Sequence, residues 1–357
     1  MNRSLLSLGM TLLTLSLVDS AFAQQPSSSP FQSQAASIQA LTMVGSDILY
    51  AGSFGLGVFR SEDRGASWTK SSEGVSDPFI LSLATAKDGT VYVGTFRGGV
   101  FRTTDQGKTW HPVNAGLKRK EVKTLLAAGD LLYAGTADGA YRLNTSDDHW
   151  GVVTSGLDEI LVHALAQSAD GTLYAGTSGK GVLKFKANTT GWVRLHDGLK
   201  DHEGMVENFI RVLTIDREGG IYAGTFDGGV FRSPDGGNTW RPISRALPND
   251  SIRSIIFNSR GLFVATGHGI FKTTDKGRQW VPLNNGLTSM AVQVLVESPS
   301  GSLYAGTNAG AFRSDDDGKS WSPINEGLEG GVAPPPFLFR LCWSGAACVL
   351  KWRQQRD

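Results

Sequence analysis

The sequence predicts an all-β fold, a seven-bladed β-propeller built of four-stranded antiparallel blades. A Tyr-Ala-Gly-Thr-like strand, a glycine hairpin and a Val-Phe-Arg-like strand recur seven times, at spacings of 41 to 48 residues. Each copy ends in a Trp that falls 17 or 18 residues after the leading aromatic residue. Repeats of this length that hold only strand-forming segments are typical of propellers. The leading aromatics are Tyr50, Tyr92, Tyr133, Tyr174, Tyr222, Phe263 and Tyr304, and the tryptophans are Trp68, Trp110, Trp150, Trp192, Trp240, Trp280 and Trp321.

Each repeat contains four short strands. In the fifth, 210–214, 220–225, 229–232 and 240–243 are β-branched and apolar runs separated by hairpin-length gaps, which predicts one antiparallel blade. The first strand of each of the other blades is expected at 38–42, 80–84, 122–126, 162–166, 252–256 and 292–296.

The two ends differ from the repeats. Residues 1–23 have a cationic start, an apolar stretch and Ala21-Phe22-Ala23, which predicts a cleaved signal peptide rather than a membrane span and a secreted or periplasmic protein. Residues 24–36 are rich in Ser, Gln and Pro and predict a flexible leader. We expect the propeller over 37–327. The tail, 328–357, holds a triple proline and both cysteines, Cys342 and Cys348; it either caps the closure of the ring or is a disordered or aberrant terminus.

Charge and composition limit the function. Lys plus Arg number 34 and Asp plus Glu 33, and no run of like charges stands out, so nucleic-acid binding through a general basic field is disfavoured. No His or Cys spacing predicts a metal site. We expect no cofactor, no membrane span after signal removal, and a monomer.

A turn between the third and fourth strands reads Ser/Thr-x-Asp-x-Gly-x-(Ser/Thr/Gln)-Trp in five of the seven repeats. The Asp side chain can accept hydrogen bonds from the amides of its own turn, and the Gly supplies a positive φ. The Trp is expected to pack against the adjacent blade with its indole N–H bonded. The third and fourth repeats keep Trp150 and Trp192 but lose the Asp-Gly pair, so their turns should be built differently. The five pairs are Asp63 and Trp68, Asp105 and Trp110, Asp235 and Trp240, Asp275 and Trp280, and Asp316 and Trp321.

This octapeptide resembles the Asp-box, or BNR repeat, of sialidase-like and xyloglucanase-like propellers. The resemblance implies an arginine triad for sialidases, but the chain lacks the Phe/Tyr-Arg-Ile-Pro segment that carries the first arginine, and sialidases have six blades. Xyloglucanase-type hydrolases have seven blades, but their cleft lies between two propellers. The phrasing Gly-Gly-Val-Phe-Arg-Ser-x-Asp-Gly-Gly-x-Thr-Trp is most similar to the photosystem II stability and assembly factor-like group, which implies a module that binds partner proteins.

Positions that depart from the repeat are the better site candidates. The largest departure is the insertion Lys200–Asn208, which holds Asp201, Glu203 and Glu207. These carboxylates are the catalytic candidates if the chain is a glycoside hydrolase. The alternative is a solvated surface loop that became longer.

The second residue of each first strand predicts a ring around the central channel. Its members in blade order are Gln39, Leu81, Lys123, His163, Arg211, Arg253 and Gln293. Lys123, His163, Arg211 and Arg253 are neighbours in this ring and suit an anionic ligand; alternatively they extend to the channel mouth and pair with Glu207, Asp158 or water.

Phe54, Phe96 and Phe226 occupy one place on the second-to-third strand hairpins. They either stack on a ligand or cover the hairpin beneath. We therefore expect a secreted, non-enzymatic binding or assembly module with a protein, carbohydrate or anionic ligand at the channel mouth, and glycoside hydrolysis is the alternative.

Overall fold

The computed structural model describes residues 35–145, 147–153, 156–157, 159–186, 191–195, 198–199, 209–245, 247 and 251–328. The described residues form seven four-stranded antiparallel sheets. The predicted signal peptide, nearly all of the leader, the insertion with Asp201, Glu203 and Glu207, and all but the first residue of the tail lie outside them. No helix among the described residues is long and apolar enough to cross a membrane.

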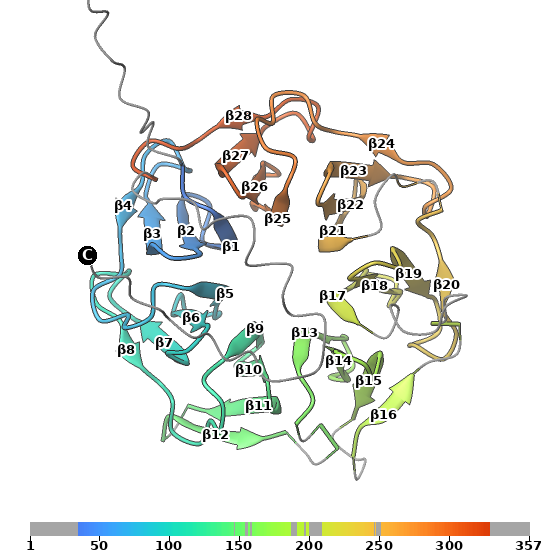
Figure 1. Ribbon diagram of the computed structural model, residues 1–357, viewed down its shortest axis with the longest axis horizontal. Coiled ribbons are helices and arrows are strands. Elements are labelled where there is room, and N and C mark those ends of the chain that lie inside the picture. The colour runs from blue at the N-terminus through green and yellow to red at the C-terminus, as the bar shows by residue number, and fades with distance from the viewer. Residues whose placement is uncertain are drawn as a thin grey trace, which may run out of the picture. The chain divides into compact units, whose positions relative to one another are not determined.

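The sheets are the blades of a seven-bladed propeller, with the first strand of each blade innermost (Figure 1). Every first strand begins at the predicted residue and runs one or two residues further. These strands are β1 (Ile38–Val44), β5 (Ile80–Thr85), β9 (Val122–Ala128), β13 (Val162–Gln167), β17 (Ile210–Ile215), β21 (Ile252–Asn258) and β25 (Val292–Glu297). The second strands are β2 (Ile48–Ser53), β6 (Val91–Thr95), β10 (Leu131–Thr136), β14 (Leu173–Thr177), β18 (Ile221–Thr225), β22 (Gly261–Thr266) and β26 (Leu303–Thr307).

The outer strands become shorter toward the rim. The third strands are β3 (Gly57–Ser61), β7 (Val100–Thr103), β11 (Gly139–Asn144), β15 (Val182–Phe185), β19 (Val230–Ser233), β23 (Gly269–Thr273) and β27 (Gly310–Ser314). The fourth strands are β4 (Thr69–Lys70), β8 (His111–Pro112), β12 (His149–Val152), β16 (Val193–Leu195), β20 (Arg241–Pro242), β24 (Val281–Pro282) and β28 (Ser322–Pro323). β20 is shorter than the 240–243 expected, and a proline, which lacks an N–H, is its second residue.

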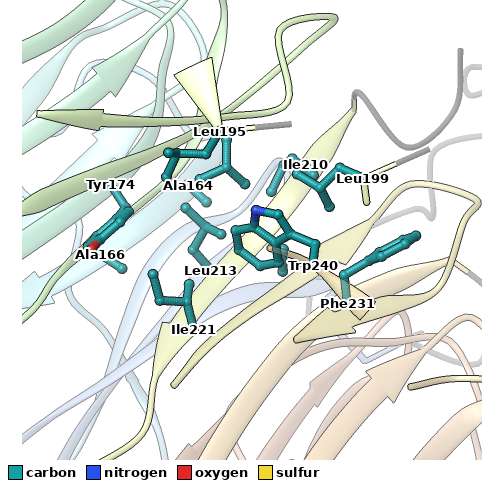
Figure 2. Close-up of a cluster of buried hydrophobic side chains, with 12 residues drawn as sticks. Ala164, Ala166, Tyr174, Leu195, Leu199, Ile210, Leu213, Ile221, Phe231 and Trp240 are labelled. Carbon is teal, nitrogen blue, oxygen red and sulfur yellow. The ribbon is translucent and has the colours of Figure 1, made fainter. Parts of the chain in front are cut away.

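The hydrophobic core lies between neighbouring blades. Figure 2 shows one such layer, in which Ala164, Tyr174 and Leu195 of the fourth blade meet Leu213 and Trp240 of the fifth. The second-strand glycine makes this approach possible: a Cβ on Gly224 would lie 2.5 Å from Cγ2 of Ile252 in the next blade. Each blade therefore buries its apolar face only against its neighbours.

The repeated Trp ties its own blade to the preceding one. The indole N–H of Trp110 donates to the carbonyl of Ser71 at 2.8 Å, and its backbone N–H donates to Glu73 at 2.8 Å. Trp150, Trp280 and Trp321 make the same indole bond to Val113, Ile243 and Leu283. The tryptophans are thus packing residues of the framework, as expected, although the buried indole nitrogens of Trp192 and Trp240 have no hydrogen-bond partner among the described residues.

The same contact closes the ring. Trp68 of the first blade donates its indole N–H to Ile324 and its backbone N–H to Glu326, both at 2.8 Å and both just after β28. Ala36 donates to Leu328 at 3.0 Å, and Leu328 is fully buried. Among the described residues, the first blade consists of β1 to β4 and the last blade of β25 to β28, so the two blades share no sheet. Side-chain packing and these hydrogen bonds therefore close the ring.

The Asp-box turn has the predicted hydrogen bonds. Asp63 accepts from the Ser67 N–H at 2.9 Å and from the Ser67 hydroxyl at 2.6 Å, while the Gly65 N–H donates to the Ser61 hydroxyl at 2.8 Å. Gly65 has φ +88°, and the residue before it, Arg64, is also left-handed at φ 60°. The turn recurs around Asp105, Asp235, Asp275 and Asp316. In the Asp275 turn, Gln279 stands at the Ser/Thr position and lacks the hydroxyl of the other boxes.

The third blade is built differently, as its sequence predicts. Trp150 lies inside β12, which pairs with β11 from Asn144 opposite His149 to Tyr141 opposite Val152. In the fourth blade, residues 187–190 lie outside the described part, and Trp192 is only partly buried.

Removing Trp110 should cost more stability than removing Trp192. Trp110 is buried and bonded, whereas Trp192 is half-buried and its indole N–H has no partner. We expect Trp110→Ala to lower the free energy of unfolding by about 3–5 kcal/mol, and Trp192→Ala by clearly less. Urea unfolding followed by circular dichroism measures both; equal losses would contradict the role given to the indole bond.

The Asp-box carboxylates should make the fold sensitive to acid. Hydrogen bonds from Ser67 lower the pKa of Asp63 from 3.8 to about 2, and those from Thr239 and Ser320 do the same for Asp235 and Asp316. Between the ordinary pKa of 3.8 and the folded-state pKa of about 2, the unfolded chain binds more protons than the folded chain. The stabilisation that these carboxylates give the fold is therefore complete above the unfolded pKa and is lost as pH falls toward 2. Urea midpoints should therefore fall between about pH 5 and pH 2.5, and Asp63→Asn should reduce that fall; an unchanged pH slope in this variant would refute the assignment.

Candidate functional site

The predicted ring residues share one backbone feature. In every blade the pairing of first and second strands skips one residue, and that residue is the predicted ring member: Ile38 pairs with Ser53 and Ala40 with Gly52, which leaves Gln39 as the extra residue of a β-bulge. A bulge redirects a side chain and increases the local twist. The other extra residues are Leu81, Lys123, His163, Arg211, Arg253 and Gln293.

Four consecutive ring members influence one another's charge. Burial, followed by the charges of Lys123 and Arg211, lowers the pKa of His163 to about 4. Burial, followed by the charge of Arg253, lowers the pKa of Arg211 to about 10. Burial also lowers the pKa of Arg253. The structure thus brings these residues together as one cationic arc around the innermost strands of the third to sixth blades, in which His163 is neutral at pH 7.

The arc is only partly neutralised by the protein. Lys123 Nζ lies 2.6 Å from Glu121 Oε1, and His163 Nε2 shares a hydrogen bond with Ser178 Oγ at 2.6 Å. Among the described residues, neither Arg211 nor Arg253 forms an ion pair. The Nε and one Nη nitrogen of Arg253 are buried and have no hydrogen-bond partner within the part of the chain that the structure describes. Of the alternative partners expected from the sequence, Glu207 and Asp158 lie outside the described residues.

The rest of the ring is uncharged and locally satisfied. Gln39 Nε2 donates to Ser37 Oγ at 3.0 Å, and Gln293 Nε2 donates to Asn308 Oδ1 at 2.6 Å. Leu81 is the third member. The ring of bulge residues is therefore polarised, with its cations on one side.

Two of the three predicted hairpin aromatics accompany the cations. The Arg211 guanidinium lies 5.5 Å from the ring centroid of Phe226, a side chain that is 59 % exposed. Phe96 lies 5.6 Å from Lys123 Nζ and 5.2 Å from the Arg97 guanidinium. Phe54 instead contacts Phe79 edge to face at 4.9 Å.

The loops of the second and third blades form a groove of about 630 Å³ that the ring pattern alone does not predict. It is lined by Phe96, Arg97, Arg119, Lys120, Glu121, Asp138 and Glu159. The signal in the sequence is the basic run Lys118-Arg119-Lys120, which a charge balance over the whole chain conceals.

Where the pKa of a described Asp departs from its ordinary value, it is lowered, from Asp47 to Asp316. The described residues also contain no group of three or more His, Cys, Asp or Glu side chains that could hold a metal ion. The hydrolase candidates Asp201, Glu203 and Glu207 lie outside the described part.

The fold and the repeated turn define the class: the chain is a seven-bladed Asp-box β-propeller. The BNR/Asp-box repeat profile matches residues 101–112, the turn of the second blade with its flanking strands. No curated protein matches the sequence.

Solved structures resemble the chain in fold alone. The extracellular domain of protein BT3049 from B. thetaiotaomicron, named for a hybrid two component system, is 18% identical with a TM-score of 0.68 over 80% of this chain and 40% of its own. YCF48 bound to D1 peptide is 14% identical with a TM-score of 0.62, over 78% of this chain and 92% of its own. The GH74 xyloglucanase from Xanthomonas campestris is 15% identical with a TM-score of 0.64, over 83% and 55%. The chain thus spans less than two thirds of the B. thetaiotaomicron protein and of the xyloglucanase.

The arrangement of the arc predicts the titration of His163. Lys123 and Arg211 both oppose protonation of the imidazole, so Lys123→Gln should raise the pKa of His163 from about 4 toward its ordinary value. NMR titration of the imidazole resonances measures this shift. Gln293→Asn, on the uncharged side of the ring, is the control and should leave the pKa unchanged; an equal shift in both variants would mean that the arc is not electrostatically coupled.

Proposed function

We propose that the chain is a secreted or periplasmic, non-enzymatic binding or assembly module that acts as a monomer. It holds an anionic group of its partner or ligand at the channel mouth. Arg211 and Arg253 bind the anion, Lys123 and His163 extend the site along the arc, and Phe226 provides an apolar contact beside Arg211.

The observation that carries this proposal is that Nε and one Nη nitrogen of Arg253 are buried without a hydrogen-bond partner among the described residues. Buried donors of a cation that lack a partner are costly, and, after burial, the charge of Arg253 is the next cause of the lowered pKa of the neighbouring Arg211. An oxyanion would supply the missing acceptors and offset the repulsion between the two arginines. The bulges place the side chains before any ligand binds, which lowers the ordering cost of binding.

Two comparisons support a binding role without assigning a ligand. YCF48 is a propeller of this fold that has been captured with a peptide, and the B. thetaiotaomicron relative is an extracellular domain. The extracellular location of that domain agrees with the export of this chain that residues 1–23 predict. A shared fold does not transfer activity, so the proposal depends on the arc itself.

Neutralising the two arginines should abolish anion binding. We expect Arg211→Gln with Arg253→Gln to lose retention on immobilised polyglutamate, heparin and oligogalacturonate, because the charge-assisted bonds are gone. Retention of the purified chain at low and moderate salt measures this.

The matched control is Arg278→Gln with Lys319→Gln, which removes two exposed cations from Asp-box turns. It should elute with the wild type. If the arginine variant remains folded and is retained as well as this control on every matrix, the channel mouth is not an anion site.

A further inference from the structure

The groove between the second and third blades is lined by charged groups of both signs. We refer to Arg97, Arg119 and Lys120 as its cationic wall and to Asp138 and Glu159 as its acidic wall; Glu121 also lines the groove. Among the described residues, the three cations form no ion pair with protein carboxylates, and Glu159 forms none with protein cations. Within the described part, the groove therefore presents these three cations and the unpaired carboxylate of Glu159 to a ligand, whereas Asp138 Oδ2 lies 4.0 Å from Lys118 Nζ.

The cationic wall is held in place by its backbone. Asp77, which is buried, accepts from the N–H groups of Arg97 and Gly98, the latter at 3.0 Å, and from the Phe79 N–H at 3.1 Å. The Gly99 N–H donates to the Lys120 carbonyl at 3.0 Å. The Arg97 hairpin and the Lys118–Lys120 run are thus fixed to each other, and only the long side chains remain to be ordered on binding.

The acidic wall is similarly defined. Asp138 accepts from the Tyr141 hydroxyl at 3.0 Å and from the Glu159 N–H at 3.3 Å. Glu159 itself is exposed and has a left-handed backbone, φ 59°. A non-glycine residue in this conformation costs free energy and is often found at binding sites.

The two walls together select a ligand chemistry. The cations donate hydrogen bonds and need acceptors such as carboxylates, whereas the ionised side chain of Glu159 can accept hydrogen bonds but cannot donate them. A sugar acid provides both, because its carboxylate suits Arg97 and Arg119 and its hydroxyls can donate to Glu159. An acidic peptide such as polyglutamate offers only its backbone N–H groups as donors and no hydroxyls, and a neutral sugar leaves the cations without acceptors.

The groove continues into the cationic arc. Phe96 lies between Arg97 and Lys123, with both cations within 6 Å of its ring, and Glu121 of the groove bonds Lys123. A chain of sugar acids could thus place one carboxylate in the groove and another toward the channel mouth.

We propose that the ligand of this face is an acidic oligosaccharide of uronic acid residues, one of which binds in the groove between Arg97, Arg119 and Glu159. This inference rests on the proposed function, because it identifies the chemical class of the anion at the channel mouth. The groove residues set the preference for sugar acids over acidic peptides.

The test measures binding of purified oligogalacturonides of three to six residues by titration calorimetry, beside polyglutamate of similar length and the methyl-esterified oligogalacturonide. The wild type should prefer the free acid sugar to both other ligands. Arg97→Gln with Arg119→Gln should weaken its binding roughly 10-fold or more, as expected for lost charge-assisted hydrogen bonds. Arg278→Gln with Lys319→Gln is the charge-matched control and should bind as the wild type does.

Glu159→Gln separates the two ligand classes. It should weaken oligogalacturonide binding by replacing a charged acceptor of hydroxyl hydrogen bonds with a neutral amide, yet strengthen polyglutamate binding by removing like charge that no hydroxyl bond offsets. The inference is overturned if the groove variants bind oligogalacturonide as the wild type does, or if the wild type prefers polyglutamate.

The failures of the two proposals are distinguishable. If Arg211→Gln with Arg253→Gln abolishes anion binding while the groove variants do not change it, the proposed function stands and the sugar-acid assignment falls. If neither pair of substitutions changes binding, both fall. Thermal unfolding of each variant confirms that loss of binding is not loss of fold.

Discussion

The contact between neighbouring blades is the constraint on which the rest of the structure depends. No blade has a second sheet to cover its face, so its apolar residues are buried only where the next blade approaches. The second-strand glycine sets how close that approach is, and the bonded indole fixes one blade relative to the preceding one. The Trp68 contact extends the same rule across the two ends of the propeller sequence, so the ring closes by repetition of one interaction.

A repeated framework separates the residues that fold the chain from those that can bind. The bulge recurs in all seven blades, whatever residue occupies it: Leu81, Gln39 and Arg253 all adopt it. The backbone therefore fixes the position and leaves the side chain free to vary. The charge of the arc is a property of individual blades, superimposed on a geometry that they all share.

The parts of this structure that could be predicted from sequence are those that the repeat determines. First strands begin where β-branched runs begin, and Asp63 and its equivalents form the expected turn because all its partners lie within a few residues. The ring positions were predictable for the same reason, but the bulge was not, since it depends on pairing between strands. The groove could not be predicted, because Arg97 and Glu159 come from different blades and line the same groove only through the conformation of their loops.

The strongest argument that the arc is functional comes from comparing equivalent positions in the ring. Leu81 shows that an apolar side chain is accommodated at the bulge, and Gln39 shows that a neutral polar one is satisfied by a neighbouring residue. Folding therefore does not require a cation there. Arg211 and Arg253 nevertheless occupy adjacent positions, where burial disfavours the charged form of both side chains and the charge of Arg253 further disfavours that of Arg211. A framework that accepts leucine at this place but holds two opposed guanidinium groups is less stable than it could be, and binding of an anion is the process that would recover that free energy.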